Sequence, residues 1–132
     1  MSGTWPDDPR AFVLEYLDAW NVGDVDRVCD AYSLPTILYS EGRLQPRLDQ
    51  AAQRAWLGRY IDSTRAELAA GTRWTCPSLA IAPLGPRSAL ATAQWVFTRT
   101  DGTVLEDYPD TYLMVRVGGR WLFMADIIDP AS

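Results

Sequence analysis

The last third of the chain, residues 88–129, consists of three long runs in which β-branched, aromatic and other hydrophobic residues predominate. Two pairs, Asp101-Gly102 and Gly118-Gly119, separate the three runs. Both pairs suit the positive φ angles that tight two-residue hairpins require. The pattern therefore predicts a three-stranded antiparallel meander at the C-terminal end of the sequence.

The first half of the chain has helical spacing instead, with apolar residues three or four positions apart. A first helix is expected from Asp8 to about Gly23, where glycine ends it. A second, shorter helix is expected to begin after Asp24 and to carry residues up to Tyr32. The longest expected helix begins after Asp49 and ends near residue 71.

Two further strands are expected between these segments. Residues 36–40 (TILYS) are typical of a short strand followed by a turn at Gly42. Residues 72–81 form a second candidate strand, and Pro77 inside it indicates an edge strand or a bulge. A turn is expected at residues 83–86, which read Pro-Leu-Gly-Pro.

These elements predict an α+β fold in which three helices pack on one curved sheet. The 132 residues are 48% hydrophobic and 22% charged, which is typical of one globular domain with a sizeable core. We therefore expect a single domain over residues 1–132. A curved sheet closed by helices forms a cone, and its apolar interior can hold a small molecule.

The charge pattern narrows the possible partners and the location. The net charge is −5 and no basic patch is present, so binding of nucleic acid is not expected. No apolar run is long enough to span a membrane, and the first residues do not form a signal peptide. A cytoplasmic protein is expected, in which Cys29 and Cys76 are reduced thiols.

The chain contains no histidine, and this absence limits the available chemistry. Histidine-based nucleophile activation, imidazole base catalysis and histidine metal sites are all excluded. The neighbours Glu106 and Asp107 point to opposite faces of a strand, so they do not form a metal site. No glycine-rich phosphate loop is present. Neither a metal nor a cofactor is therefore expected.

Asp126 is the main candidate for acid–base chemistry. Alternation along the last strand places Asp126 on one face with Leu122, Met124 and Ile128. If this face points into the cone, desolvation raises the pKa of the carboxyl group and suits it to proton transfer near neutral pH. The alternative is a structural carboxylate that is paired with an arginine or hydrogen-bonded at the end of the sheet.

Three short motifs resemble the nuclear transport factor 2-like (NTF2-like) superfamily. They are the segment from Tyr16 to Asp24 (YLDAWNVGD), Asp110-Thr111-Tyr112 and Gly119-Arg120-Trp121. The superfamily includes ketosteroid isomerases, SnoaL-like polyketide cyclases, limonene epoxide hydrolases and many non-enzymatic modules. The resemblance spans the whole chain and implies a cone of three N-terminal helices on a strongly curved, mainly antiparallel mixed sheet that encloses one pocket. It also implies a homodimer formed through the outer face of the sheet, to which Trp74, Trp95 or Trp121 could contribute.

The resemblance also implies roles for individual residues. Tyr16 and Asp110 match the tyrosine and the protonated aspartic acid that form the oxyanion hole of ketosteroid isomerases. Asp126 resembles by position the strand aspartate of the cyclases and epoxide hydrolases. The position of the isomerase base is Ser40, so a steroid-type isomerase is not expected. Without a catalytic role, Tyr16 is a core tyrosine and Asp110 caps a bend after Pro109.

The leading hypothesis is a cofactor-free acid–base enzyme that acts on a small, largely apolar or aromatic carbonyl- or enol-type molecule. Asp126 is the expected base or acid, and Tyr16 and Asp110 bind the developing oxyanion. The alternative is a non-catalytic ligand-binding or dimerisation module of the same fold, and a protein-interaction domain is a third possibility. The expected lining of the pocket comprises Trp20, Trp56, Tyr60, Trp95, Tyr112, Met114, Met124 and Ile128.

Overall fold

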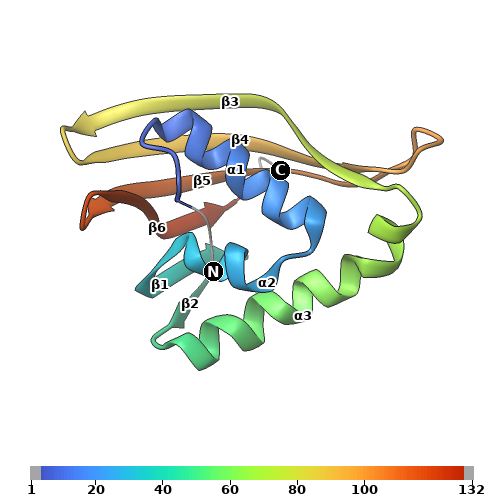
Figure 1. The fold of residues 1–132 in the computed structure, drawn as a ribbon, viewed down its shortest axis with the longest axis horizontal. Helices are drawn as coiled ribbons and strands as arrows, with labels where there is room; N and C mark the ends of the chain where they lie inside the picture. The colour runs from blue at the N-terminus through green and yellow to red at the C-terminus, as the bar shows by residue number, and fades with distance from the viewer. Residues whose placement is uncertain (1–3, 130–132) are drawn as a thin grey trace.

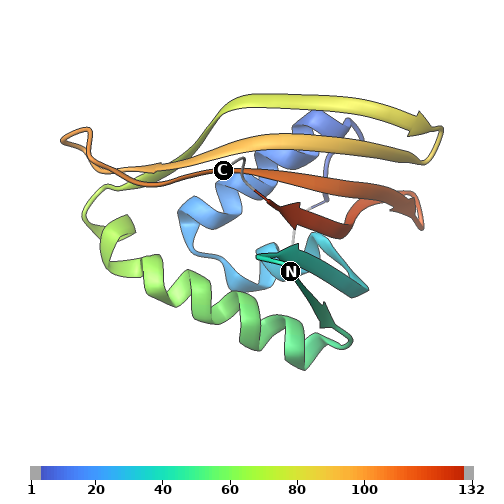
Figure 2. The ribbon, with the colours of Figure 1, turned by 180° about the vertical axis from the view of Figure 1, so that it is seen from behind.

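The computed structural model of the chain describes residues 4–129 and places three helices on one side of a curved sheet (Figures 1 and 2). The helices and strands, in chain order, are α1 (Pro9–Val22), α2 (Val25–Asp30), β1 (Tyr32–Ser40), β2 (Arg43–Arg47), α3 (Gln50–Ala69), β3 (Arg73–Gly85), β4 (Ser88–Thr98), β5 (Val104–Val117) and β6 (Arg120–Ile128). The predicted α+β class is confirmed.

The ends of α1 and α3 follow from their capping residues. Asp8 precedes α1, and its side chain accepts a hydrogen bond from the backbone N–H of Ala11. Gly23 ends this helix with a φ of 77°, a left-handed conformation that glycine adopts without strain. Asp49 caps α3 in the same way as Asp8 caps α1. Both helices therefore begin and end within a residue or two of the predicted positions.

The strands form one sheet in the order β2-β1-β6-β5-β4-β3. Only the β1–β6 pair is parallel, so the sheet of the described chain is mixed and mainly antiparallel, as predicted. The C-terminal meander is β4-β5-β6. Strand β3 lies at an edge and its register shifts between Thr75 and Ser78, which confirms both alternatives that Pro77 indicated. This strand continues to Gly85, so the turn expected at 83–86 begins later.

One of the two predicted hairpin turns is correct. Gly118 and Gly119 have φ angles of 59° and 80°, and they form the two-residue turn between β5 and β6. The β4–β5 connection is longer than expected, since the N–H of Arg99 bonds the carbonyl of Thr103. Gly102 is at a φ of 92° in the bulge position after the turn rather than in its centre.

The segment between α2 and α3 differs most from the prediction. Tyr32 was expected on the second helix, but it begins β1 and pairs with Phe123 of β6. Pairing with β6 outweighs the helical spacing, because it places the Tyr32 side chain in the core. Strand β2 was not predicted, since its sequence, RLQPR, has no hydrophobic alternation.

A bulge in β6 changes which residues face the helices. Leu113 pairs with Ala125 but Met114 pairs with Phe123, so Met124 is an extra residue in the ladder. Phe123 and Asp126 both point inward as a result. Met124 is 39% exposed, and its expected position on the face of Asp126 is wrong because the bulge interrupts the alternation.

The tryptophans that could have contributed to an outer interface are on the inner side of the sheet. Trp121 is buried in the core, and its indole N–H donates to the backbone carbonyl of Asp7 at 2.7 Å. Trp74 and Trp95 line the cavity described below. These tryptophans therefore do not project from the outer face, through which the resemblance implies a dimer. None of the helices within residues 4–129 has the length and apolarity needed to cross a membrane.

Candidate functional site

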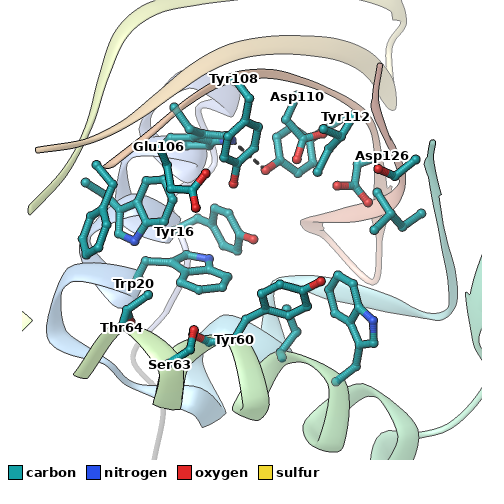
Figure 3. Close-up of a pocket in the computed structure, with 18 of the residues that line it drawn as sticks. Tyr16, Trp20, Tyr60, Ser63, Thr64, Glu106, Tyr108, Asp110, Tyr112 and Asp126 are labelled. Carbon is teal, nitrogen blue, oxygen red and sulfur yellow. Dashed lines mark hydrogen bonds between the residues drawn. The ribbon is translucent and has the colours of Figure 1, made fainter. Parts of the chain in front are cut away.

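A cavity of about 680 Å³ lies between the concave face of the sheet and helices α1 and α3 (Figure 3). Its lining includes the three residues expected to carry chemistry, Tyr16, Asp110 and Asp126. Six of the residues expected to line a pocket also do so: Trp20, Trp56, Tyr60, Trp95, Tyr112 and Ile128. The volume is in the range of small-molecule sites.

The two methionines expected in the lining are not part of it. Met114 is fully buried in the core below the cavity. Met124 is displaced to the outer face by the bulge in β6. Only the position of Met124 is explained by the bulge. Met114 keeps the predicted face of β5, but the core covers it completely.

Asp110 and Asp126 lie at one end of the cavity, beside Tyr112 (Figure 3). Asp110 and Tyr112 share a face of β5, and Asp126 of β6 is directly opposite Tyr112. The two carboxyl groups are therefore diagonal neighbours on adjacent strands. The residues are 3% and 5% exposed, and the Oδ1 atom of each has no hydrogen-bond partner among the described residues.

Burial and proximity set different protonation preferences for the two carboxyl groups. Burial, the negative charge of Asp126 and a hydrogen bond to it raise the pKa of Asp110 well above its usual value. Burial also raises the pKa of Asp126, but the hydrogen bond with Asp110 and the charge of Arg47 oppose this rise. The pair therefore holds one proton to higher pH than an isolated aspartate, with Asp110 as the preferred carrier.

Tyrosine hydroxyl groups extend this polar end of the cavity. The hydroxyl oxygens of Tyr16 and Tyr32 are 2.6 Å apart, and either group can be the donor. Two hydroxyl groups that share one hydrogen bond leave one proton for a further acceptor. Burial raises the pKa of both groups, which keeps them protonated at neutral pH. The hydroxyl of Tyr112 accepts a hydrogen bond from the indole N–H of Trp95 at 3.0 Å.

Arg47 of β2 is a buried cation that the sequence did not reveal. It is 3% exposed, and its guanidinium carbon lies 4.1 Å from the ring centre of Trp56 and 5.4 Å from that of Tyr32. Its Nε donates to the side-chain oxygen of Gln53, while its Nη1 and Nη2 atoms have no hydrogen-bond partner among the described residues. Arg47 therefore supplies positive charge close to Asp126.

Replacing Arg47 by methionine is expected to raise the pKa of Asp126. Methionine keeps the length and apolar stem of the side chain but removes the charge that favours the ionised carboxylate. Carboxyl-carbon NMR titration measures the change. Arg59→Met, at an exposed position of α3 outside the cavity lining, is the matched control, and an equal shift in both variants would show that Arg47 has no specific effect.

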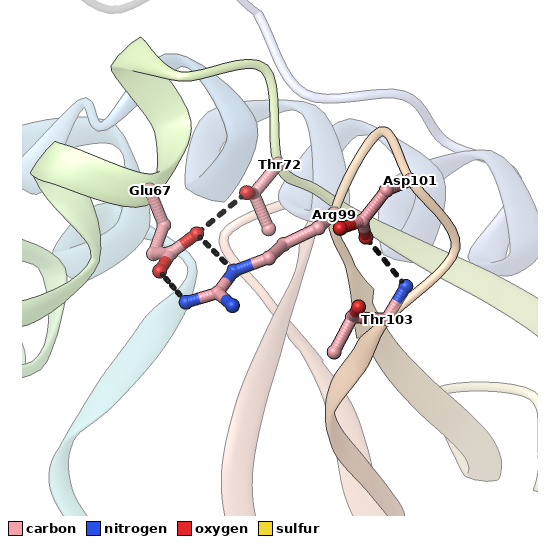
Figure 4. A network of polar contacts seen from close by, with 5 residues as sticks. All are labelled: Glu67, Thr72, Arg99, Asp101 and Thr103. Carbon is pink, nitrogen blue, oxygen red and sulfur yellow. Dashed lines mark hydrogen bonds and ion pairs between the residues drawn. The ribbon is translucent and has the colours of Figure 1, made fainter.

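The far part of the cavity lining contains a second polar network (Figure 4). Glu67 of α3 accepts two hydrogen bonds from Arg99, at 2.7 and 3.1 Å, and one from Thr72 at 2.8 Å. Hydrogen bonds from Arg99 and Thr72 lower the pKa of Glu67 to about 2. Glu67 is therefore a fixed anion that connects the end of α3 to the β4–β5 loop, and it is not suited to proton transfer.

Several lining residues were missed by sequence reasoning. Glu41 and Ser40 both line the cavity, because Glu41 lies in the β1–β2 turn at a φ of 53°. Tyr108 and Glu106 share a face with Asp110, and the alternation of β5 already contained this signal. Within residues 4–129, no group of three or more metal-ligating side chains comes together.

The sequence and the fold were compared with known proteins. A family model described as "NTF2-like protein (DUF6841)" matches residues 7–129. No protein of curated function matches the sequence.

Solved structures show the same fold at low sequence identity. An NTF2-like protein of unknown function from Shewanella oneidensis is 19% identical with a TM-score of 0.68, over 92% of this chain and 98% of that one. A "putative ketosteroid isomerase" from Shewanella frigidimarina is 14% identical with a TM-score of 0.66, over 96% and 100% of the two chains. A "putative calcium/calmodulin dependent protein kinase II association domain" from Xanthomonas campestris is 17% identical with a TM-score of 0.57, over 98% and 93%. These similarities establish the cone fold, which hosts unrelated functions.

Proposed function

The chain belongs to the NTF2-like family DUF6841, and on this premise we propose that its cavity is the active site of a cofactor-free acid–base enzyme. Its substrate is a small, largely apolar carbonyl or enol compound. One observation carries the proposal: two carboxyl groups, nine-tenths buried, face one cavity with an unpartnered oxygen each. Buried polar groups are almost always hydrogen-bonded, so unpaired ones in a cavity are typical of functional sites.

The two carboxyl groups have different roles in the proposed reaction, one as the base and one as a hydrogen-bond donor. Asp126, whose carboxylate is favoured by Arg47, removes a proton from the carbon next to the carbonyl group. The electron pair of the broken C–H bond forms a carbon–carbon double bond, and the π electrons of the carbonyl group move onto its oxygen. Protonated Asp110 and the free hydroxyl proton of the Tyr16–Tyr32 pair donate hydrogen bonds to this oxygen. Return of the proton to the same or another carbon completes an isomerisation or an exchange.

Exchange of carbon-bound hydrogen with solvent tests this proposal before the natural substrate is known. Small aryl ketones and cyclic enones are incubated with the protein in deuterium oxide, and loss of the α-proton signal is followed by NMR. We expect catalysed exchange for at least one compound that fits the cavity. Buffer-level exchange across the panel would contradict the proposal.

A non-catalytic module is the second candidate, favoured by the outer face of the sheet. All three helices of the described chain lie on the other side, and Met124 and Ile127 of the outer face are 39% and 48% exposed. Exposed apolar residues on an uncovered sheet favour a homodimer through this face. The similarity to the protein from Xanthomonas campestris that is described as a "putative" association domain also supports an assembly role. Sedimentation measurements of the protein at several concentrations test for the dimer.

A further inference from the structure

We propose that the cavity binds a substrate with a cationic nitrogen, held beside Glu106 in a cage of aromatic rings. This inference rests on the proposed function, since it names the substrate class of the same cavity. It concerns the part of the cavity away from the Asp110–Asp126 pair, which the acid–base mechanism leaves without a role (Figure 3).

The strand register brings the aromatic rings of the cage together beside Glu106. Trp74 of β3 is directly opposite Phe97 of β4, which in turn is directly opposite Glu106 of β5. Directly paired residues project from the same face of a sheet, so these three side chains stand in one row and all line the cavity. Tyr108 follows Glu106 on the same face.

The rings around Glu106 are fixed by contacts with each other. Trp74 stacks on Phe97 with ring centres 4.6 Å apart, and it meets Trp20 and Tyr108 edge-on at 6.2 and 6.1 Å. The backbone of Trp74 is held by Asn21 through two hydrogen bonds of 2.8 and 2.9 Å. A cage that is already in place loses little entropy when a ligand enters.

The charge of the lining favours a cation. Among the described residues, the lining contains the acidic residues Glu41, Glu67, Glu106 and Asp126, the protonated Asp110, and one arginine, Arg43. Glu67 is neutralised by Arg99, whereas Glu106 has no hydrogen bond or ion pair with any described residue. Aromatic faces attract ammonium groups, and cages of such rings recognise quaternary ammonium ligands. Glu106 is exposed and lines the cavity beside these rings, so its carboxylate can pair with an alkylammonium group that the rings hold.

A second observation ties this cage to a ligand. Asp110, whose Oδ1 is buried without a partner, lies on the same face of β5 four residues from Glu106. Four residues of a strand span roughly 13 Å. The geometry therefore fits one molecule with its carbonyl group at the Asp110–Asp126 pair and its cationic nitrogen at Glu106.

Two probes of the same shape test for the cation. Phenyltrimethylammonium and tert-butylbenzene differ in charge but hardly in size, and their binding to the full chain is followed by NMR shifts and tryptophan fluorescence. We expect the cation to bind about tenfold more tightly than the neutral isostere. Glu106→Gln is expected to reduce this preference at least about threefold. Asp107→Asn, on the opposite face of the same strand, is the matched control and is expected to leave the preference unchanged.

Three results would overturn the inference: equal binding of the two probes, no binding of either, or an unchanged preference in Glu106→Gln. Failure of this inference can be distinguished from failure of the proposed acid–base function. Exchange of α-protons in neutral ketones without any cation preference would reject only the substrate class. Cation preference without any exchange activity would reject catalysis and leave the cavity as a binding site for cations.

Discussion

The Asp126→Asn variant is expected to exchange the α-protons of a reactive ketone about 100- to 10,000-fold more slowly than the unchanged protein. Asparagine has nearly the same shape as aspartate but cannot accept a proton from carbon. The residue is 5% exposed and lines the cavity, and the substitution removes the base while keeping the volume of the side chain. The measurement is the initial exchange rate by proton NMR in deuterium oxide.

Asp129→Asn is the matched control for this loss. Asp129 follows β6 three residues after Asp126 and is exposed, so its substitution is expected to leave the exchange rate unchanged. Circular dichroism and thermal unfolding establish that both variants are folded. If a folded Asp126→Asn protein retained the full rate, Asp126 would not be the base.

The Asp110→Asn variant is expected to be more stable than the unchanged protein at pH 8, by on the order of 1–3 kcal/mol. Burial raises the pKa of Asp110 above that of the unfolded chain, so the folded state binds more protons than the unfolded state between the two pKa values. The unchanged protein therefore loses stability as the pH rises through this window. Asparagine does not titrate, so the advantage of the variant is smallest near pH 4 and grows towards pH 8.

Denaturant unfolding at a series of pH values measures this difference. Asp107→Asn is the control, because Asp107 is on the exposed face of the same strand, where its side chain accepts a hydrogen bond from Gln94. A pH-independent difference between Asp110→Asn and the unchanged protein would mean that Asp110 titrates as an ordinary aspartate. A gain in the free energy of unfolding would mean that the buried carboxyl group of Asp110 is kept for function although it destabilises the fold.

The parts of the fold that the sequence predicts are those with strong local signals. Capping aspartates mark α1 and α3, and Gly118-Gly119 marks the β5–β6 turn. Strand β2 lacks such a signal, because its position depends on pairing with β1 rather than on its own residues. The same holds for Tyr32, whose assignment to a strand depends on β6, far along the chain.

The candidate site was predicted only in part, because some of its side-chain positions depend on strand pairing and leave no local signal in the sequence. Tyr16, Asp110 and Asp126 come together in the cavity, but the reasoning that grouped Asp126 with Met124 failed at the bulge. Arg47 could not be found, since nothing in the β2 sequence indicates that its guanidinium is buried beside aromatic rings. Glu106 could have been found from the alternation that contains Asp110, by extending it towards the β4–β5 loop.

Asp110 and Asp126 are expected to share a proton at the buried end of the cavity, and carboxyl-carbon NMR titration of both residues measures this. We expect the pair to release its last proton well above the usual aspartate pKa of about 3.9, with Asp110 as the main carrier. Two independent titrations at or below that value would mean that both carboxylates are solvated or paired with cations, and the shared proton would be rejected.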